Sequence, residues 1–120
     1  MKALGIHLLA EMQSCAPDKL DSAEFIEKCM LEAAEVAGAM VINSFFRKFL
    51  PCGISGVVVI AESHLSIHTW PEFQYAAVDV FTCGEKVDPW NALKHIETSL
   101  EAQSADVAVF NRGIINGLDR

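Results

Sequence analysis

The chain has 120 residues, of which 52% are hydrophobic and 21% are charged, with only seven Gly and four Pro. This composition excludes a disordered, collagen-like or low-complexity chain, and the length suits one domain spanning residues 1–120. Nine Lys and Arg against sixteen Asp and Glu give a net charge of -7, the wrong sign for a protein that neutralises nucleic-acid phosphates. We therefore expect no nucleic-acid partner. A cationic small molecule would suit this charge better, but acidic residues that simply keep the protein in solution are the favoured interpretation.

Alternating and helical apolar patterns predict the elements of the N-terminal part. Leu4–Met12 predicts a first strand, and Ser14–Lys19 predicts a loop. The helix that follows is predicted to begin with Asp21 as its N-cap, and Glu24 three positions later completes a capping-box pattern. Apolar residues then recur at helical spacing up to Gly38, which is placed to end this helix.

β-branched and aromatic residues predict further strands in the rest of the chain. These strands span Met40–Phe49, Ile54–Glu62, Tyr75–Thr82 and Asp106–Asn111. Asp88 and Pro89 supply an N-cap and a first-turn proline for a second helix, because apolar residues follow them at helical spacing. Residues Gly113–Arg120 show neither pattern and are expected to fray.

The order strand, helix, several strands, helix, strand determines the predicted fold class. Amphipathic helices must cover a sheet face, so we predict an α+β fold: a two-layer α/β sandwich with an antiparallel or mixed sheet and two helices on one face. Four consecutive β-branched residues, Val57–Ile60, indicate a strand that is apolar on both faces. The open face of the sheet is therefore expected to pack against a second copy in a homodimer.

The N-terminal residues and the cysteines predict a cytoplasmic location. Residues 1–11 contain one Lys and a short apolar run interrupted by His7, without the features of a secretory signal. No apolar run approaches the roughly 20 residues that a membrane-spanning helix needs, so no membrane association is expected. The cysteines are Cys15, Cys29, Cys52 and Cys83. They form no Cys-x-x-Cys pair, which favours free thiols in a reducing compartment.

Polar residues with chemical potential are concentrated in residues 62–72, ESHLSIHTWPE, directly after an apolar strand. His64 and His68 have the spacing of zinc ligands on a helix, but the general-base Glu of His-Glu-x-x-His is absent, and we predict no metal. Ser63 near a histidine is compatible with a hydrolase nucleophile, yet no Gly-x-Ser-x-Gly elbow surrounds it. From spacing alone, a structural bend with hydrogen-bonded histidines is the favoured interpretation.

Residues 61–72, AESHLSIHTWPE, and residues 75–84, YAAVDVFTCG, resemble the small prokaryotic S-adenosylmethionine decarboxylase proenzymes. The resemblance extends over nearly the whole chain, including Phe49-x-Pro51, Ser55-Gly56 and Asp88-Pro89-Trp90. Members of this family generate a covalent pyruvoyl cofactor by self-cleavage and assemble as dimers. The resemblance therefore implies S-adenosylmethionine as substrate, and a decarboxylated product that supplies spermidine synthesis.

The resemblance also implies self-cleavage between Glu62 and Ser63. Ser63 would attack the carbonyl of Glu62 to give an ester, and elimination followed by hydrolysis would leave the pyruvoyl group. That ketone, as a Schiff base with the substrate amine, delocalises the carbanion left by decarboxylation. His68, whose residue type has a near-neutral pKa, matches the proton acceptor in processing, and Ser55 matches a residue that assists it. Cys83 matches the proton donor of the decarboxylation step.

Three further residues match the family's substrate pocket. Phe49 matches the residue that stacks on the adenine, and Glu72 matches one that binds the ribose hydroxyls. Leu65 is expected to line the adenine pocket from the opposite side. Because this set is adenosyl-specific, it disfavours a related pyruvoyl enzyme acting on arginine or ornithine.

An unprocessed binding or regulatory partner is the other alternative. The presence of Ser63, His68 and Cys83 together argues against it.

Overall fold

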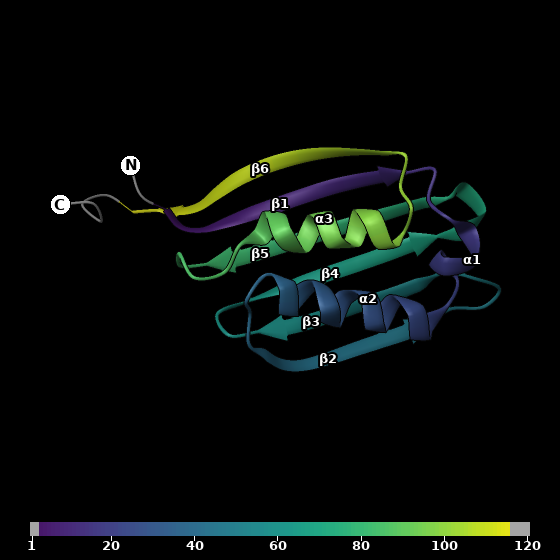
Figure 1. Cartoon of the computed structure of the whole chain (residues 1–120), viewed down its shortest axis with the longest axis horizontal. Coiled ribbons are helices and arrows are strands. Elements are labelled where there is room, and N and C mark those ends of the chain that lie inside the picture. Colours follow the sequence, from purple (N-terminus) through teal and green to yellow (C-terminus); the bar gives the residue numbers. More distant parts are fainter. Residues whose placement is uncertain (1–2, 116–120) are drawn as a thin grey trace.

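Six antiparallel strands form one sheet in the computed structural model of the chain, which describes residues 3–115 (Figure 1). The strands are β1 (Ala3–Gln13), β2 (Val41–Lys48), β3 (Ile54–Ile60), β4 (Ser63–Trp70), β5 (Tyr75–Cys83) and β6 (Ser104–Ile114). Their order across the sheet is β2-β3-β4-β5-β1-β6. The helices are α1 (Pro17–Leu20), α2 (Ala23–Val36) and α3 (Pro89–Ser99), with a short 3-10 turn, η1, over Pro71–Phe73.

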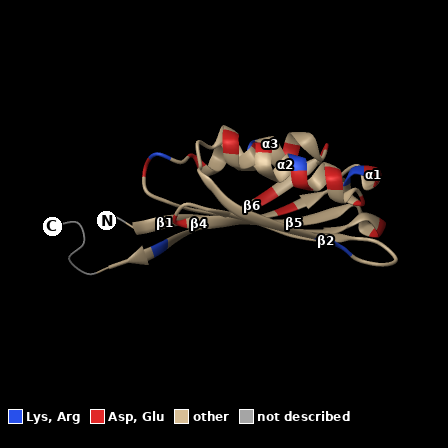
Figure 2. Ribbon diagram, turned by 90° about the horizontal axis from the view of Figure 1, so that it is seen from below, with Lys and Arg blue, Asp and Glu red and all other residues tan. Residues whose placement is uncertain are grey.

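Both long helices, α2 and α3, lie on one face of the sheet (Figure 2). The predicted α+β two-layer sandwich is confirmed, and every strand pair is antiparallel. Alternate side chains of the strands point toward the helices and are excluded from water. This core includes Leu8, Met12, Ile26, Met30, Val58, Leu65, Ile67, Val78, Ile96 and Leu100. Each such side chain contributes about 1.5–3 kcal/mol by its burial.

The second face of the sheet carries no helix among residues 3–115 (Figure 2). Its side chains are the other half of the alternation, and several are large and apolar. Phe45 is 65% exposed, Phe110 is 54% exposed and Val59 is 41% exposed. We call this surface the open face.

The helix ends were predicted in part. Asp88 is the N-cap of α3, since its Oδ1 accepts from Trp90 N at 2.9 Å, and Gly38 follows the end of α2 with a φ of 81°. The Asp21 N-cap and its capping box are wrong. Ser22 caps α2 instead, with Oγ accepting from Phe25 N at 3.1 Å.

Three segments differ from the expected secondary structure. Pro17–Leu20 forms the short helix α1, which overlaps the loop predicted over Ser14–Lys19. Ser63–Trp70 is a strand rather than a bend, with His64, Ser66 and His68 on the open face and the apolar Leu65 and Ile67 buried on the other. The last strand continues to Ile114 because its backbone pairs with β1, so the expected fraying of Gly113 is wrong. Residues 116–120 of that expectation lie outside the described part of the chain.

Thr69 provides the first test of the packing. Thr69 is 5% exposed, and its hydroxyl accepts from Ile54 N at 2.9 Å and donates to Leu20 O at 2.8 Å. Thr69→Val leaves both backbone groups buried and unpaired, so we expect the free energy of unfolding to fall by about 2–4 kcal/mol. Urea denaturation at a fixed protein concentration measures this. Thr69→Ser keeps the hydroxyl and serves as the control; equal stability of the Val variant and the original protein would contradict the assignment.

Candidate functional site

The β3–β4 hairpin places Ser63 directly after a strained residue. Ile60 pairs with Ser63, so the turn between the strands consists of Ala61 and Glu62. Glu62 has a φ of 74°, a left-handed conformation that side chains other than glycine adopt at a cost of order 1–3 kcal/mol. The Ser63 Oγ is buried and has no hydrogen-bond partner among the described residues. The nucleophilic oxygen and the strained carbonyl that it would attack are therefore adjacent.

Cys83 lies at the same end of the sheet as this hairpin. In the β4–β5 register His64 is opposite Phe81, and continuing that register by two positions places Glu62 opposite Cys83. On its other side Cys83 pairs with Gly5 of β1. A Cβ added at Gly5 would lie 3.0 Å from the Cys83 Sγ and 2.6 Å from the Thr82 O. The absence of a side chain at Gly5 thus leaves the space that the thiol occupies.

A basic and aromatic cluster lies on the open face beside Cys83. His7 stacks on Phe81 with ring centroids 5.0 Å apart, and Arg112 lies 5.1 Å from the same ring. Arg112 Nη1 is 2.8 Å from His7 Nδ1, and because a guanidinium only donates, that imidazole nitrogen accepts. Desolvation lowers the pKa of His7, against the opposing effect of Asp79 and with smaller contributions from Arg112 and His64. His7 is therefore neutral at neutral pH.

Ser55 and His68 meet at the opposite end of the open face. They are paired across β3 and β4, and Ser55 Oγ lies 2.8 Å from His68 Nδ1. This hydrogen bond fixes the orientation of the imidazole, with the direction of donation set by the ring tautomer.

Phe49 and Glu72 lie beside this Ser55–His68 pair. A cavity of about 260 Å³ is lined by Phe49, Cys52, Ser55, His68, Trp70 and Glu72, among others. A second cavity of about 250 Å³ shares Phe49, Ser55 and His68 with it. Arg47 lies 5.5 Å from the Phe49 ring centroid, so a cation covers that ring. Four of the predicted site residues therefore surround one pair of neighbouring cavities.

Ser63 and His68, which the resemblance assigns to the same processing step, are far apart within one chain. Ser63 and His68 are five residues apart on one strand, which corresponds to about 16 Å at roughly 3.3 Å per residue. His68 of the same chain therefore does not reach Ser63. By the same spacing His64 and His68 are about 13 Å apart, too far to share a metal ion.

The side chain of Leu65 lies on the other side of the sheet. It is fully buried in the core beneath the helices, as the alternation along β4 requires. The expectation that this side chain lines a pocket with Phe49 is not met, and only the Leu65 backbone is available to a ligand on the open face.

The sequence analysis did not identify several residues that flank the site. Gly5, His7 and Arg112 come from the two strands at the chain termini, and Arg47 comes from an edge strand. Their positions follow from register, since Gly5 is opposite both Cys83 and Arg112. The signal available in the sequence was the two-residue spacing of Gly5 and His7, which places both on the same face of a strand.

Two general features of the described residues bear on the site. None of the helices in residues 3–115 is long and apolar enough to cross a membrane. Within the same residues, no group of three or more His, Cys, Asp or Glu side chains is arranged to hold a metal ion.

The chain is similar to proteins of one family. Residues 6–113 match the family model described as S-adenosylmethionine decarboxylase. The S-adenosylmethionine decarboxylase proenzyme of Thermotoga petrophila is 53% identical over 113 residues, which cover 94% of this chain and 87% of that protein. The proenzyme of Caldicellulosiruptor saccharolyticus is 54% identical over 114 residues, covering 95% of this chain and 92% of that one.

Solved structures agree with these relatives. The crystal structure of the adenosylmethionine decarboxylase from Aquifex aeolicus matches with a TM-score of 0.91 and 41% identity, covering 96% of this chain and 95% of that chain. The Trypanosoma brucei AdoMetDC-delta26 monomer matches with a TM-score of 0.66 at 17% identity, covering 87% of this chain and 45% of that one, which is a likeness of fold alone. The fold is thus that of the adenosylmethionine decarboxylase class. The sequence matches go further: this chain belongs to the S-adenosylmethionine decarboxylase family.

Gly5 allows a direct test of the space around Cys83. In Gly5→Ala the new methyl group meets the backbone oxygen of Thr82, which cannot rotate away, so Cys83 and its strand must shift. We expect a loss of about 1–3 kcal/mol in the free energy of unfolding. We also expect a changed rate of Cys83 alkylation by iodoacetamide, followed by peptide mass mapping. Unchanged stability together with an unchanged alkylation rate would contradict this reading of Gly5.

Proposed function

We propose that this protein is a self-processing, pyruvoyl-dependent S-adenosylmethionine decarboxylase that releases carbon dioxide and the decarboxylated substrate used in spermidine synthesis. Family membership supports the activity, and the Glu62-Ser63 hairpin carries the processing step. A buried hydroxyl that has no hydrogen-bond partner within residues 3–115, next to a carbonyl held by a residue with a positive φ, suits attack on that peptide bond. The residues present therefore fit a pyruvoyl group formed from Ser63.

Processing is an intramolecular rearrangement followed by loss of the Ser63 oxygen. The Ser63 Oγ adds to the Glu62 carbonyl carbon while its proton passes to a base, and the amide C–N bond breaks to give an ester with a free amine. Removal of the Ser63 Cα proton then expels the Glu62 carboxylate. Addition of water and loss of ammonia complete the ketone. His68 and Ser55 are the residues that we assign to these proton transfers.

The pyruvoyl group, once formed, supplies an electron sink for the carbanion left by decarboxylation. The chain's own residues then bind the substrate and return a proton. Cys83 lies at the hairpin end of the open face and is assigned as the donor to the substrate Cα. Phe49 presents a ring for the adenine, and Glu72 presents a carboxylate for the ribose hydroxyls.

We further propose that each site is shared between two protomers. Cys83 and the Glu62–Ser63 turn lie at one end of the sheet, whereas Ser55, His68 and Phe49 lie at the other end, about 16 Å away along the strand. The Ser63 side chain itself shares the helix-facing side of β4 with Leu65, so the peptide bond of the turn, at the end of the sheet, is the part that a second chain would reach. A two-fold axis between two facing sheets, running across the strands, would bring the first end of one protomer onto the second end of its partner. The exposed apolar side chains of the open face support burial against such a copy.

The cysteines support the proposed cytoplasmic location. All four, Cys15, Cys29, Cys52 and Cys83, are free thiols. Free thiols persist in a reducing compartment.

Ser63→Ala tests self-processing. This variant lacks the nucleophilic oxygen, so we expect a single uncleaved chain without a keto group, whereas the unmodified chain separates into two polypeptides on a denaturing gel. Intact mass spectrometry measures both the cleavage and the pyruvoyl end. A freshly purified unmodified chain that stays whole through prolonged incubation would contradict the proposal.

Co-expression of two inactive variants tests the shared site. Ser63→Ala lacks the nucleophile, and His68→Ala lacks the proposed base. In a mixed dimer, one site combines the Ser63 of one chain with the His68 of the other and is complete, while the second site lacks both. Because half of randomly paired dimers are mixed and each has one complete site, we expect about a quarter of the processing found in the unmodified protein.

The identity of the cleaved chain decides the outcome. With distinguishable tags, cleavage should appear only in the His68→Ala chain of the mixed dimer. If neither chain is cleaved on co-expression, and each variant alone is folded and dimeric by light scattering, the shared site is wrong. Cleavage of purified His68→Ala alone would remove His68 from processing.

A further inference from the structure

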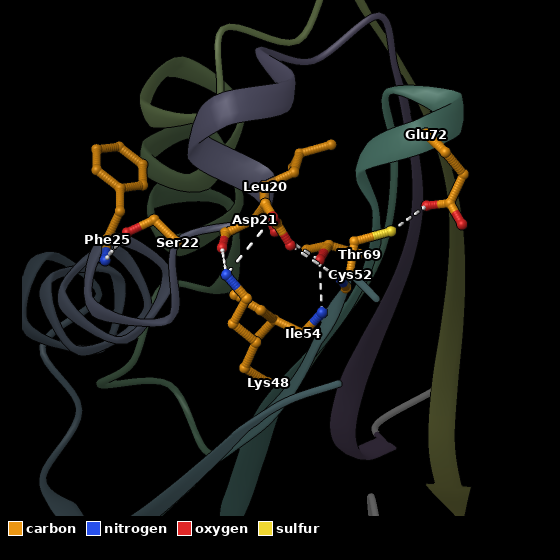
Figure 3. A network of polar contacts seen from close by, with 10 residues as sticks. Leu20, Asp21, Ser22, Phe25, Lys48, Cys52, Ile54, Thr69 and Glu72 are labelled. Carbon is orange, nitrogen blue, oxygen red and sulfur yellow. Dashed lines mark hydrogen bonds and ion pairs between the residues drawn. The ribbon is translucent and has the colours of Figure 1, made fainter. Parts of the chain in front are cut away.

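The loop between β2 and β3, residues 49–53, is fastened at both ends to one residue (Figure 3). Asp21 Oδ1 accepts from Gly53 N at 3.0 Å, and Lys48 Nζ donates to Asp21 O at 2.9 Å. A further bond, from Phe49 N to Gly53 O at 2.8 Å, closes the loop on itself. Both ends of the loop are therefore held at the junction of α1 and α2.

Cys52 projects from this loop toward Glu72, as Figure 3 shows. Its Sγ lies 3.5 Å from the Glu72 Oε1, with the thiol as donor and the carboxylate as acceptor. Within residues 3–115, this is the one hydrogen bond or ion pair recorded for the Glu72 side chain. Glu72 itself lies on the short 3-10 turn η1, between β4 and β5. The hydrogen bonds that hold the loop therefore also fix the position from which Cys52 contacts Glu72.

The Cys52 thiol keeps the proton that such a bond requires. Its pKa is raised by desolvation, by donation to Glu72 and by the negative charges of Glu72 and Asp21, and Lys48 opposes this. At neutral pH the group is therefore S–H rather than a thiolate that would repel the carboxylate.

We propose that Cys52 is a positioning residue for Glu72. It holds the Glu72 Oε1 by a hydrogen bond and leaves the Oε2 free to accept hydrogen bonds from the ribose hydroxyls of a substrate bound in the cavity that both residues line. The inference rests on the adenosyl pocket proposed above and adds a residue to it. Cys52 is remote from the Glu62–Ser63 turn and is assigned no part in the proton transfers, so its effect is expected on ligand binding and not on processing.

The test compares two ligands on processed protein. 5′-Methylthioadenosine carries both ribose hydroxyls, and its 2′,3′-dideoxy analogue carries neither. For Cys52→Ala we expect a rise in the dissociation constant of the first ligand of about two- to fivefold, as for the loss of one weak hydrogen bond. The affinity for the dideoxy analogue should be unchanged. Isothermal titration calorimetry supplies both constants.

Three further variants identify the cause. Cys52→Ser retains a hydrogen-bond donor and should bind 5′-methylthioadenosine like the unmodified chain. Leu50→Ala alters a side chain of the same loop that is 91% exposed, and it should bind both ligands normally. In a Glu72→Ala background, Cys52→Ala should have no additional effect, because the acceptor is already absent.

Several results would overturn the assignment. Equal weakening of both ligands by Cys52→Ala would mean that the loop acts on the adenine side and not through Glu72. Loss of ribose-dependent binding in Cys52→Ser as large as in Cys52→Ala would exclude hydrogen donation, and no loss in either variant would exclude any role. By contrast, failure of the unmodified chain to process or to bind 5′-methylthioadenosine would refute the proposed function itself. Equal affinity of the unmodified chain for both ligands would refute the ribose role of Glu72.

Discussion

The length of an extended strand determines how this protein builds its site. Ser63 begins β4 and His68 is five residues further along it, so a rigid backbone keeps the two about 16 Å apart. No rotamer change closes such a distance, and β4 is a central strand that hydrogen bonds on both sides prevent from bending. The chemistry proposed for the two residues therefore requires a second chain. The open face, which carries His68 and uncovered apolar side chains, is the surface on which that chain would lie, with the Glu62–Ser63 turn reached at the end of the sheet.

Elements that depend on a local pattern of side chains were predicted from the sequence. Elements whose extent depends on backbone pairing with a distant strand were not. The two helices follow from apolar periodicity and from Asp88-Pro89, which are local signals. β4 escaped prediction because the polar residues His64, Ser66 and His68 alternate with Leu65 and Ile67, and the polar residues dominated the interpretation of the segment. The extension of β6 to Ile114 depends on the pairing of Arg112 and Ile114 with β1, more than 100 residues away in the chain. No local pattern carries such information.

The residues of the candidate site also fall into those that a local sequence motif identifies and those that only strand pairing identifies. Ser63, His68 and Cys83 were identified because they stand in a recognisable motif, and the structure adds what spacing could not give, namely which end of the sheet each one occupies. The positions of Gly5 and Arg112 near Cys83 become apparent only from the register of the paired strands. Leu65 was misplaced for the reverse reason, since residue type alone does not report which side of a strand a side chain takes.

The strain at Glu62 is compatible with a stable fold because the strands flanking it have other partners. β3 is paired with β2, and β4 is paired with β5, so neither depends on the hairpin turn to stay in the sheet. A break after Glu62 would assign β1, β2 and β3 to one polypeptide and β4, β5 and β6 to the other.

Those two sets of strands alternate across the sheet. In the order β2-β3-β4-β5-β1-β6, the first polypeptide contributes β1 between β5 and β6 of the second. Separating the two polypeptides would therefore require breaking three ladders of backbone hydrogen bonds and the common core. Cleavage can release the backbone strain at one turn and free a new chain end there, while the interleaved strands hold Cys83 and the remaining site residues where folding placed them.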